Sequence, residues 1–366
     1  MSLFSEFRSG EHVKTLAGMI RAAYPGGDRA IMEVCGTHTM AIARYGLRSL
    51  LPEGLRLVSG PGCPVCVTPA SVVDAAVELC GMPKTAVCTF GDMMRVPGSG
   101  KTLEVCRADG ADVRMLYSAG DAVDLARKEP GKRFVFISVG FETTTPGIAL
   151  SLLEADRLGL TNLSFLTANR LVIPAMEALC ASGDVRIDGF LCPGHVSVII
   201  GSLAYSGIPR DFRIPCVVGG FEPVDVLAAL YALVRQIARG EARVENAYAR
   251  AVTGGGNRTA VEVMGKVFKA VDAEWRGIGT IPKSGLALRD EYRLFDALET
   301  FGIGLRPVPE PKGCRCGDVL RGLIIPPECA LFGKRCTPEA PVGPCMVSSE
   351  GSCAAFYKYG GGLDGR

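Results

Sequence analysis

The feature that most constrains this chain is a regular alternation of short apolar runs and amphipathic stretches from residue 29 to residue 240. The apolar runs are rich in Val, Ile, Leu and Phe, as expected for strands that are buried on both faces. Strands that alternate with helices predict βαβ units and parallel sheets, so we expect an α/β fold. The predicted strands are 30–35, 55–59, 85–90, 112–117, 133–139, 163–168, 188–192 and 214–218, and helices are predicted over 69–80, 119–128, 146–159 and 223–239.

The spacing of the eight strands divides them into two groups of four, each of the size of a small domain. This predicts two Rossmann-like parallel-sheet lobes, residues 25–118 and 119–240, facing each other over a cleft. A single barrel is the alternative, because periodicity alone does not exclude it. Residues 241–366 are predicted to form a third, helical and Cys-rich segment, on which residues 1–24 pack.

Charge and hydropathy narrow the class of protein. The net charge of +2 and the lack of long Lys/Arg clusters exclude a nucleic-acid footprint. No apolar run reaches the roughly 18 residues of a membrane span, and the first ten residues lack the apolar core of a signal peptide. We therefore expect a cytoplasmic protein that binds neither nucleic acid nor membrane.

Fifteen cysteines are the unusual part of the composition. In a reducing compartment, this number indicates metal binding or thiol chemistry and not a disulfide framework. Nine cysteines lie within the first 216 residues, whereas six lie between residues 314 and 353. The distribution predicts two separate thiol systems.

The first system consists of Cys35-Gly-Thr-His38 and Cys63-Pro-Val-Cys66, each of which follows a predicted strand. Thr68 and Pro69 predict a helix start just after the second motif, with Thr68 as the N-cap. The positive end of that helix favours thiolates at Cys63 and Cys66, which makes a dithiol/disulfide couple reasonable. A Cys₃His zinc site has the same spacing, and two buried, inert thiols are a third possibility.

Other predicted strands also end in glycine followed by an ionisable residue. Because the carboxyl ends of parallel strands share one edge of a sheet, these residues are candidates for a common site. One ionisable residue after a strand is typical of an ordinary βα turn, whereas several such residues at one edge of a sheet indicate a functional site. The residues are Asp92, Arg95, Glu142, His195 and Glu222.

The second thiol system lies in a tail that is rich in Pro and Gly. Four thiolates can hold a [4Fe–4S] cluster, and no fixed spacing is required. A zinc site is the rival, but zinc sites generally contain two short Cys pairs, and only Cys314 and Cys316 are close in the sequence. The tail therefore favours an iron–sulfur cluster over zinc.

Five motifs in order resemble those of the HypD family of [NiFe]-hydrogenase maturation factors. The resemblance runs from about residue 25 to residue 360. The motifs are Cys35-Gly-Thr-His-Thr-Met40, Gly60-Pro-Gly-Cys-Pro-Val-Cys66, Gly140-Phe-Glu-Thr-Thr144, Pro193-Gly-His-Val-Ser197 and Met346-Val-Ser-Ser-Glu-Gly-Ser-Cys353.

The resemblance implies a scaffold and redox site on which Fe(II) receives its cyanide and CO ligands. The small chaperone HypC shares the iron, and HypE supplies cyanide made with HypF. Cys35 corresponds to the iron ligand, and Cys63 and Cys66 to a redox-active pair. The rival function is a non-redox scaffold that holds a structural zinc or cluster.

The resemblance also implies two similar α/β domains and a C-terminal domain with a [4Fe–4S] cluster. Six tail cysteines compete for four positions. Cys314 is an alternative to Cys316, and Cys345 is the least favoured. His38, Glu142 and His195 match family motifs and are expected to serve the iron site or to handle protons. The favoured cluster ligands are Cys316, Cys329, Cys336 and Cys353.

Overall fold

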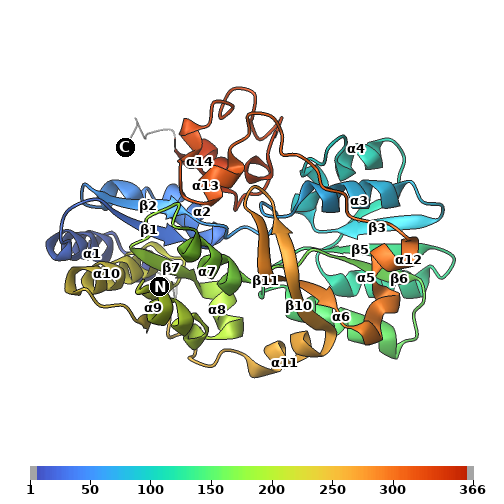
Figure 1. The fold of residues 1–366 in the computed structure, drawn as a ribbon, viewed down its shortest axis with the longest axis horizontal. Helices are drawn as coiled ribbons and strands as arrows, with labels where there is room; N and C mark the ends of the chain where they lie inside the picture. The colour runs from blue at the N-terminus through green and yellow to red at the C-terminus, as the bar shows by residue number, and fades with distance from the viewer. Residues whose placement is uncertain (1–5, 361–366) are drawn as a thin grey trace.

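A computed structural model describes residues 6–360, and its α/β architecture agrees with the sequence-based prediction (Figure 1). All eight predicted strands form, at nearly the predicted residues. They make up two separate parallel sheets and not a barrel, and a two-stranded hairpin lies beside them. The prediction of two parallel-sheet lobes is therefore confirmed.

The first sheet has five strands, all paired in parallel. Counted along the chain, its spatial order is 2-1-3-4-5, which is the flavodoxin-like arrangement. The strands, from one edge to the other, are β2 (Leu55–Ser59), β1 (Arg29–Glu33), β7 (Gly189–Pro193), β8 (Cys216–Gly219) and β9 (Val244–Asn246).

Three helices cover one face of the first sheet: α1 (Gly10–Ala23), α2 (Gly36–Arg44) and α10 (Pro223–Arg239). Helix α1 packs against α10, and Arg8 makes two hydrogen bonds to Glu222, 2.6 and 2.7 Å long. The expectation that residues 1–24 pack on the C-terminal segment is therefore wrong for residues 6–24. Residues 1–5 lie outside the described part of the chain.

The second sheet has four parallel strands, which have the order 2-1-3-4 when counted along the chain. Successive residues of β5 face opposite sides, as the strand period requires: Phe134 and Phe136 face one apolar core, and Val135 and Ile137 face another. The strands are β4 (Val113–Met115), β3 (Thr85–Thr89), β5 (Arg133–Ser138) and β6 (Leu163–Thr167).

The distribution of strands between the lobes differs from the predicted one. Residues 25–118 and 119–240 are not separate lobes, because β3 to β6 form the second sheet and β7 to β9 return to the first. Apolar periodicity identifies buried strands but does not say which of them pair. The second lobe is thus inserted into the first. The remaining helices before residue 240 are α3 (Ala70–Cys80), α4 (Leu103–Ala108), α5 (Ala119–Lys128), α6 (Thr145–Arg157), α7 (Val172–Ser182), α8 (Gly194–Ile200) and α9 (Gly207–Phe212).

Residues 241–300 are not mostly helical, contrary to the prediction. Helix α11 (Arg258–Val267) is followed by a long antiparallel hairpin of β10 (Phe268–Trp275) and β11 (Gly279–Leu288). The amphipathic run at residues 261–268 correctly indicates a helix, but the chain becomes extended at Phe268. The short helix α12 (Ala297–Phe301) follows.

The tail from residue 306 to residue 360 is mostly irregular, with two helices, α13 (Cys316–Leu320) and α14 (Ser352–Tyr359). Helix α14 packs against α2, so the tail lies beside the first sheet (Figure 1). The predicted third segment extends to residue 366, and residues 361–366 lie outside the described part. No helix within residues 6–360 has the length and apolar character needed to cross a bilayer.

Candidate functional site

The two strands at the centre of the first sheet, β1 and β7, bring Cys35 and His195 to the same edge. The strand order reverses between β1 and β7, and open α/β sheets bind ligands at the carboxyl ends of strands at such a point. Cys35 follows β1 and immediately precedes α2, and His195 lies in the first turn of α8, after β7. The topology therefore places both predicted residues at the expected ligand-binding edge.

The turn that contains Cys35 lies against the turn that contains Cys63 and Cys66. The Gly36 N–H donates a hydrogen bond to the Gly62 carbonyl, 3.0 Å long. A Cβ on Gly62 would lie 2.2 Å from the backbone nitrogen of Cys35, so the two backbones touch and only glycine fits. The structure therefore brings the turns of the Cys35–His38 and Cys63–Cys66 motifs into direct contact.

Cys35 is buried, and burial raises the pKa of its thiol to about 12. The negative charge of Glu350 adds to this rise in pKa. Hydrogen bonds from the backbone of His38 and Thr37, and from the Thr37 side chain, oppose it. At neutral pH the group is a thiol, so the binding of a metal cation must release its proton.

Cys63 and Cys66 are joined by a disulfide, with Cα atoms 5.2 Å apart. Both residues are buried, and the Cys66 N–H donates to the Cys63 sulfur, 3.1 Å away. While the sulfurs are joined, neither of them offers a thiolate to zinc. The following helix begins at Ala70, with Pro69 and not Thr68 at the N-cap, and the Thr68 hydroxyl donates to the Pro64 carbonyl.

His38 and His195 both pack against the ring of Phe221. The centroid of the Phe221 ring is 4.8 Å from that of His38 and 4.0 Å from that of His195. His38 Nε2 donates to the Gly220 carbonyl at 2.9 Å, which leaves Nδ1 buried and without a hydrogen-bond partner. Burial lowers the pKa of His38 to about 4 and also lowers the pKa of His195. Both imidazoles are therefore neutral near pH 7.

The tail reaches the Cys35 turn from the opposite side. The Thr37 hydroxyl donates to Glu350 Oε1 at 2.7 Å, and a Cβ on Gly36 would lie 2.4 Å from the Glu350 Cβ. The Ser348 hydroxyl donates to Asp92 Oδ2 at 2.7 Å, where Asp92 follows β3 of the second sheet. The Gly62 turn and the tail therefore both contact the Cys35 turn, and the tail connects it to the second sheet through Asp92.

Glu350 and Ser348 were not among the predicted site residues, although both belong to the Met346–Cys353 motif. Asp92 and Arg95, which the sequence placed after a strand of the first lobe, follow β3 of the second sheet, and both bind the tail. Arg95 Nη1 donates to the Pro338 carbonyl at 3.0 Å. Glu222, by contrast, is occupied by the ion pair with Arg8.

Glu142 follows β5, at the reversal of strand order in the second sheet. Its Oε1 accepts a hydrogen bond from the Val172 N–H at 3.0 Å, and its buried Oε2 has no partner. Burial raises the pKa of Glu142 to about 7. Within residues 6–360, no hydrogen bond or ion pair connects Glu142 to Cys35, His38 or His195, so the structure leaves it apart from them.

Replacement of Glu142 with glutamine should change the pH dependence of stability. A carboxyl with a raised pKa in the folded state stabilises the protein fully below its unfolded-state pKa of 4.5, and this contribution is lost as pH rises through 7. The shift corresponds to about 3 kcal/mol. We expect the unfolding free energy of Glu142→Gln to exceed that of the wild type at pH 8 and to approach it at pH 4.5, as measured by urea unfolding. If the unfolding free energies of the variant and the wild type differed by the same amount at pH 8 and at pH 4.5, the raised pKa of Glu142 would be contradicted.

The tail thiols are defined as Cys314, Cys316, Cys329, Cys336, Cys345 and Cys353, and all of them except Cys329 lie together in one cluster. The sulfurs of Cys314 and Cys316 lie 3.3 Å apart. Hydrogen bonds with the thiols of Cys316 and Cys353 raise the pKa of Cys345, and those with Cys316 and Cys345 lower the pKa of Cys353 to about 6. Cys345 therefore contacts two of the other thiols, although the sequence made it the least favoured ligand.

The donor chemistry of the tail thiols fits an iron–sulfur cluster, because five of them lie together where four are needed. A Cβ on Gly343 would lie 2.6 Å from the sulfurs of both Cys314 and Cys316, so the backbone at Gly343 packs directly against the thiols. The thiols touch one another instead of surrounding a centre. Accordingly, among the described residues no three His, Cys, Asp or Glu side chains are arranged around a common ion position.

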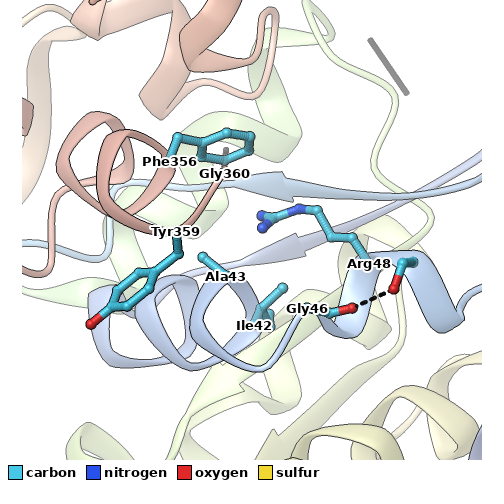
Figure 2. Close-up of a pocket in the computed structure, with 8 residues that line it drawn as sticks. Ile42, Ala43, Gly46, Arg48, Phe356, Tyr359 and Gly360 are labelled. Atoms are coloured by element: carbon cyan, nitrogen blue, oxygen red, sulfur yellow. Dashed lines mark hydrogen bonds between the residues drawn. The ribbon is translucent and has the colours of Figure 1, made fainter. Parts of the chain in front are cut away.

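A pocket of about 180 Å³ lies between α2 and α14, and no cysteine lines it. Figure 2 shows Arg48 extending across it towards Phe356. The Arg48 guanidinium lies 4.8 Å from the centroid of the Phe356 ring and pairs with Glu33 at 3.4 Å. None of the predicted site residues lines this pocket. Its contacts attach the tail to α2.

Comparisons with a family model and with individual relatives point to the same family. The family described as the hydrogenase formation hypA family, HypD, matches residues 11–360. The hydrogenase maturation factor HypD of Azotobacter vinelandii is 48% identical over 368 residues, which cover 98% of this chain and 97% of the relative. HypD of Cupriavidus necator is 47% identical over 369 residues, with the same coverage. HypD of Rhodobacter capsulatus is 47% identical over 373 residues, which cover 99% of both chains.

Proposed function

The chain belongs to the HypD family of hydrogenase maturation factors, and we propose that it is the scaffold on which the Fe(CN)₂CO group of the [NiFe]-hydrogenase active site is assembled. The observation that carries this proposal is the contact of two segments with the Cys35 turn, the Gly62 turn and the tail at Glu350, while Ser348 of the same tail binds Asp92 of the second lobe. A buried thiol at the switch point of a sheet is suited to hold one iron ion as cargo while further ligands are added.

In this proposal Cys35 is the protein ligand of the iron. HypC shares the iron, and HypE, charged by HypF, supplies the cyanide. The iron displaces the thiol proton, and the neutral His38 and His195 nearby are suited to accept protons. Glu142, which is separate from this group, serves as a second proton-handling residue from the other lobe.

Cys63 and Cys66 form the redox partner of the site. Reduction breaks the S–S bond, takes up two electrons and two protons, and leaves two thiols beside Cys35. The contact between the Gly62 and Cys35 backbones supports this role, because it places the disulfide turn directly against the iron-binding turn.

The tail thiols are proposed to hold a [4Fe–4S] cluster, which supplies single electrons when bound. We propose Cys316, Cys329, Cys336 and Cys353 as its ligands, and Cys314 as the alternative to Cys316. The contacts of Cys345 with the thiols of Cys316 and Cys353 make it a further candidate. The two tail thiols that are not cluster ligands form a second candidate redox pair.

Anaerobic purification followed by metal and sulfide analysis tests this assignment. We expect iron and acid-labile sulfide in a ratio close to one, at about four of each per chain, as a [4Fe–4S] cluster requires. Stoichiometric zinc without sulfide would instead favour the rival function, a non-redox scaffold stabilised by a structural metal.

A further inference from the structure

The turn of the β10–β11 hairpin lies between the two thiol systems. Arg276 is the first residue of this turn, and its backbone N–H donates to the Val67 carbonyl at 2.9 Å, one residue beyond Cys66. The preceding Trp275 is buried and stacks on Phe141, with ring centroids 5.9 Å apart. The turn is therefore fixed in position beside the disulfide.

The next residue of the turn packs against the tail. A Cβ on Gly277 would lie 2.6 Å from the Gly317 Cα, and a Cβ on Gly317 would lie 2.1 Å from the Gly277 carbonyl oxygen. Gly317 directly follows Cys316. Backbone contact without intervening side chains thus joins Arg276 to the tail thiols on one side and to the disulfide segment on the other.

The Arg276 side chain is a buried charge with incomplete compensation. Its residue is 1% exposed, Nη1 donates to the Pro97 carbonyl at 3.0 Å, and Nε lies 3.4 Å from Oε2 of Glu310. The Glu310 carboxylate is 44% exposed, so water screens it. Nη2 is buried and has no partner. Burying such a donor without a partner is unfavourable, and an anionic neighbour would offset that cost.

We propose that Arg276 is the buried counter-charge of the tail thiols, and that it makes the reduction potential of the cluster held there more positive. This inference rests on the cluster assignment proposed above. Four thiolates give a cluster a net negative charge, and reduction adds one more, so a fixed cation in a poorly screened position stabilises the reduced form.

Arg315 offers a control for Arg276. Among the arginines near the tail thiols, Arg315 differs in being 47% exposed and paired with Asp318 at 2.6 Å. Arg315→Gln therefore serves as a control, because it removes the same charge from a position exposed to solvent.

The test is a potentiometric titration of the anaerobically purified, full-length protein, followed by the electron paramagnetic resonance signal of the reduced cluster. We expect Arg276→Gln to shift the midpoint potential to more negative values, whereas Arg315→Gln leaves it nearly unchanged. An unshifted or more positive midpoint in a fully loaded Arg276→Gln protein would overturn the inference.

A second variant keeps the inference testable if Arg276→Gln fails to fold or to retain its cluster. Glu310→Gln removes the only carboxylate paired with Arg276 among the described residues and preserves an oxygen for the Gly277 N–H, which donates to Glu310 Oε1 at 3.1 Å. We expect a smaller shift, towards more positive potentials, and a shift in the other direction or none would overturn the proposal. Wild-type protein without acid-labile sulfide would instead overturn the cluster assignment, and this inference with it.

Discussion

Replacement of Cys35 with alanine is expected to abolish the capture of iron and, with it, hydrogenase maturation. Changes in residues that only orient metal ligands cost about 10- to 100-fold in affinity, so loss of the ligand itself should cost more than about 100-fold. The measurement is the infrared spectrum of the anaerobic complex with HypC, in which the bands of iron-bound cyanide and CO should disappear.

Cys88→Ala is a matched control for this experiment. Cys88 is also buried, but it lies within β3, in an apolar core that does not include Cys35. The control should retain the infrared bands and the far-ultraviolet circular dichroism of the wild type. If Cys35→Ala still carried the cyanide and CO bands, Cys35 would not be the iron ligand.

Replacement of Cys63 with alanine is expected to abolish maturation while the protein still binds HypC and keeps the absorbance of its cluster. The disulfide joins residues only three positions apart, so its loss adds little chain entropy to the unfolded state. Hydrogenase activity in a maturation assay should therefore fall to background without a comparable loss of fold.

Thr68→Val provides the comparison for Cys63→Ala. It removes the hydrogen bond from the Thr68 hydroxyl to the Pro64 carbonyl, 2.8 Å long, but leaves both sulfurs in place. This variant should support maturation. If Cys63→Ala lost its fold or its cluster absorbance, the pair would have a structural role and the non-redox scaffold would be favoured.

The sequence predicted the strands of this protein better than their pairing. Runs such as Phe134–Ile137 are apolar on both faces, and this pattern identifies a buried strand wherever it occurs. Pairing depends on contacts between distant residues, for example Ile31 of β1 with Gly189 of β7. Such contacts leave no periodic signal in a single sequence, so the insertion of the second lobe could not be predicted.

The sequence predicted the site residues that follow strands, and it missed a site residue that lies in an irregular segment. Cys35 and His195 follow adjacent strands, and the rule that ligands bind at the carboxyl edge of parallel strands locates them. Glu350 reaches the same place from a tail with little periodicity. No property of that segment alone indicates that Thr37 is its partner.

The hairpin of β10 and β11 was missed because it is exposed along much of its length. Its strands mix buried and exposed residues without the regular alternation that identifies a half-buried strand. Trp275, the last residue of β10, is buried, and the turn that follows it contacts the disulfide segment at Val67.

The insertion of one lobe into the other has a consequence for the order in which the protein forms during synthesis. Strands β3 to β6 are contiguous in the chain, so the second sheet can form as soon as these strands have left the ribosome. The first sheet waits for β7, β8 and β9, since β1 and β2 alone make an incomplete layer. The segment that contains Glu350 emerges after every strand. Cys35 is therefore covered last, when the ribosome has already made the rest of its surroundings.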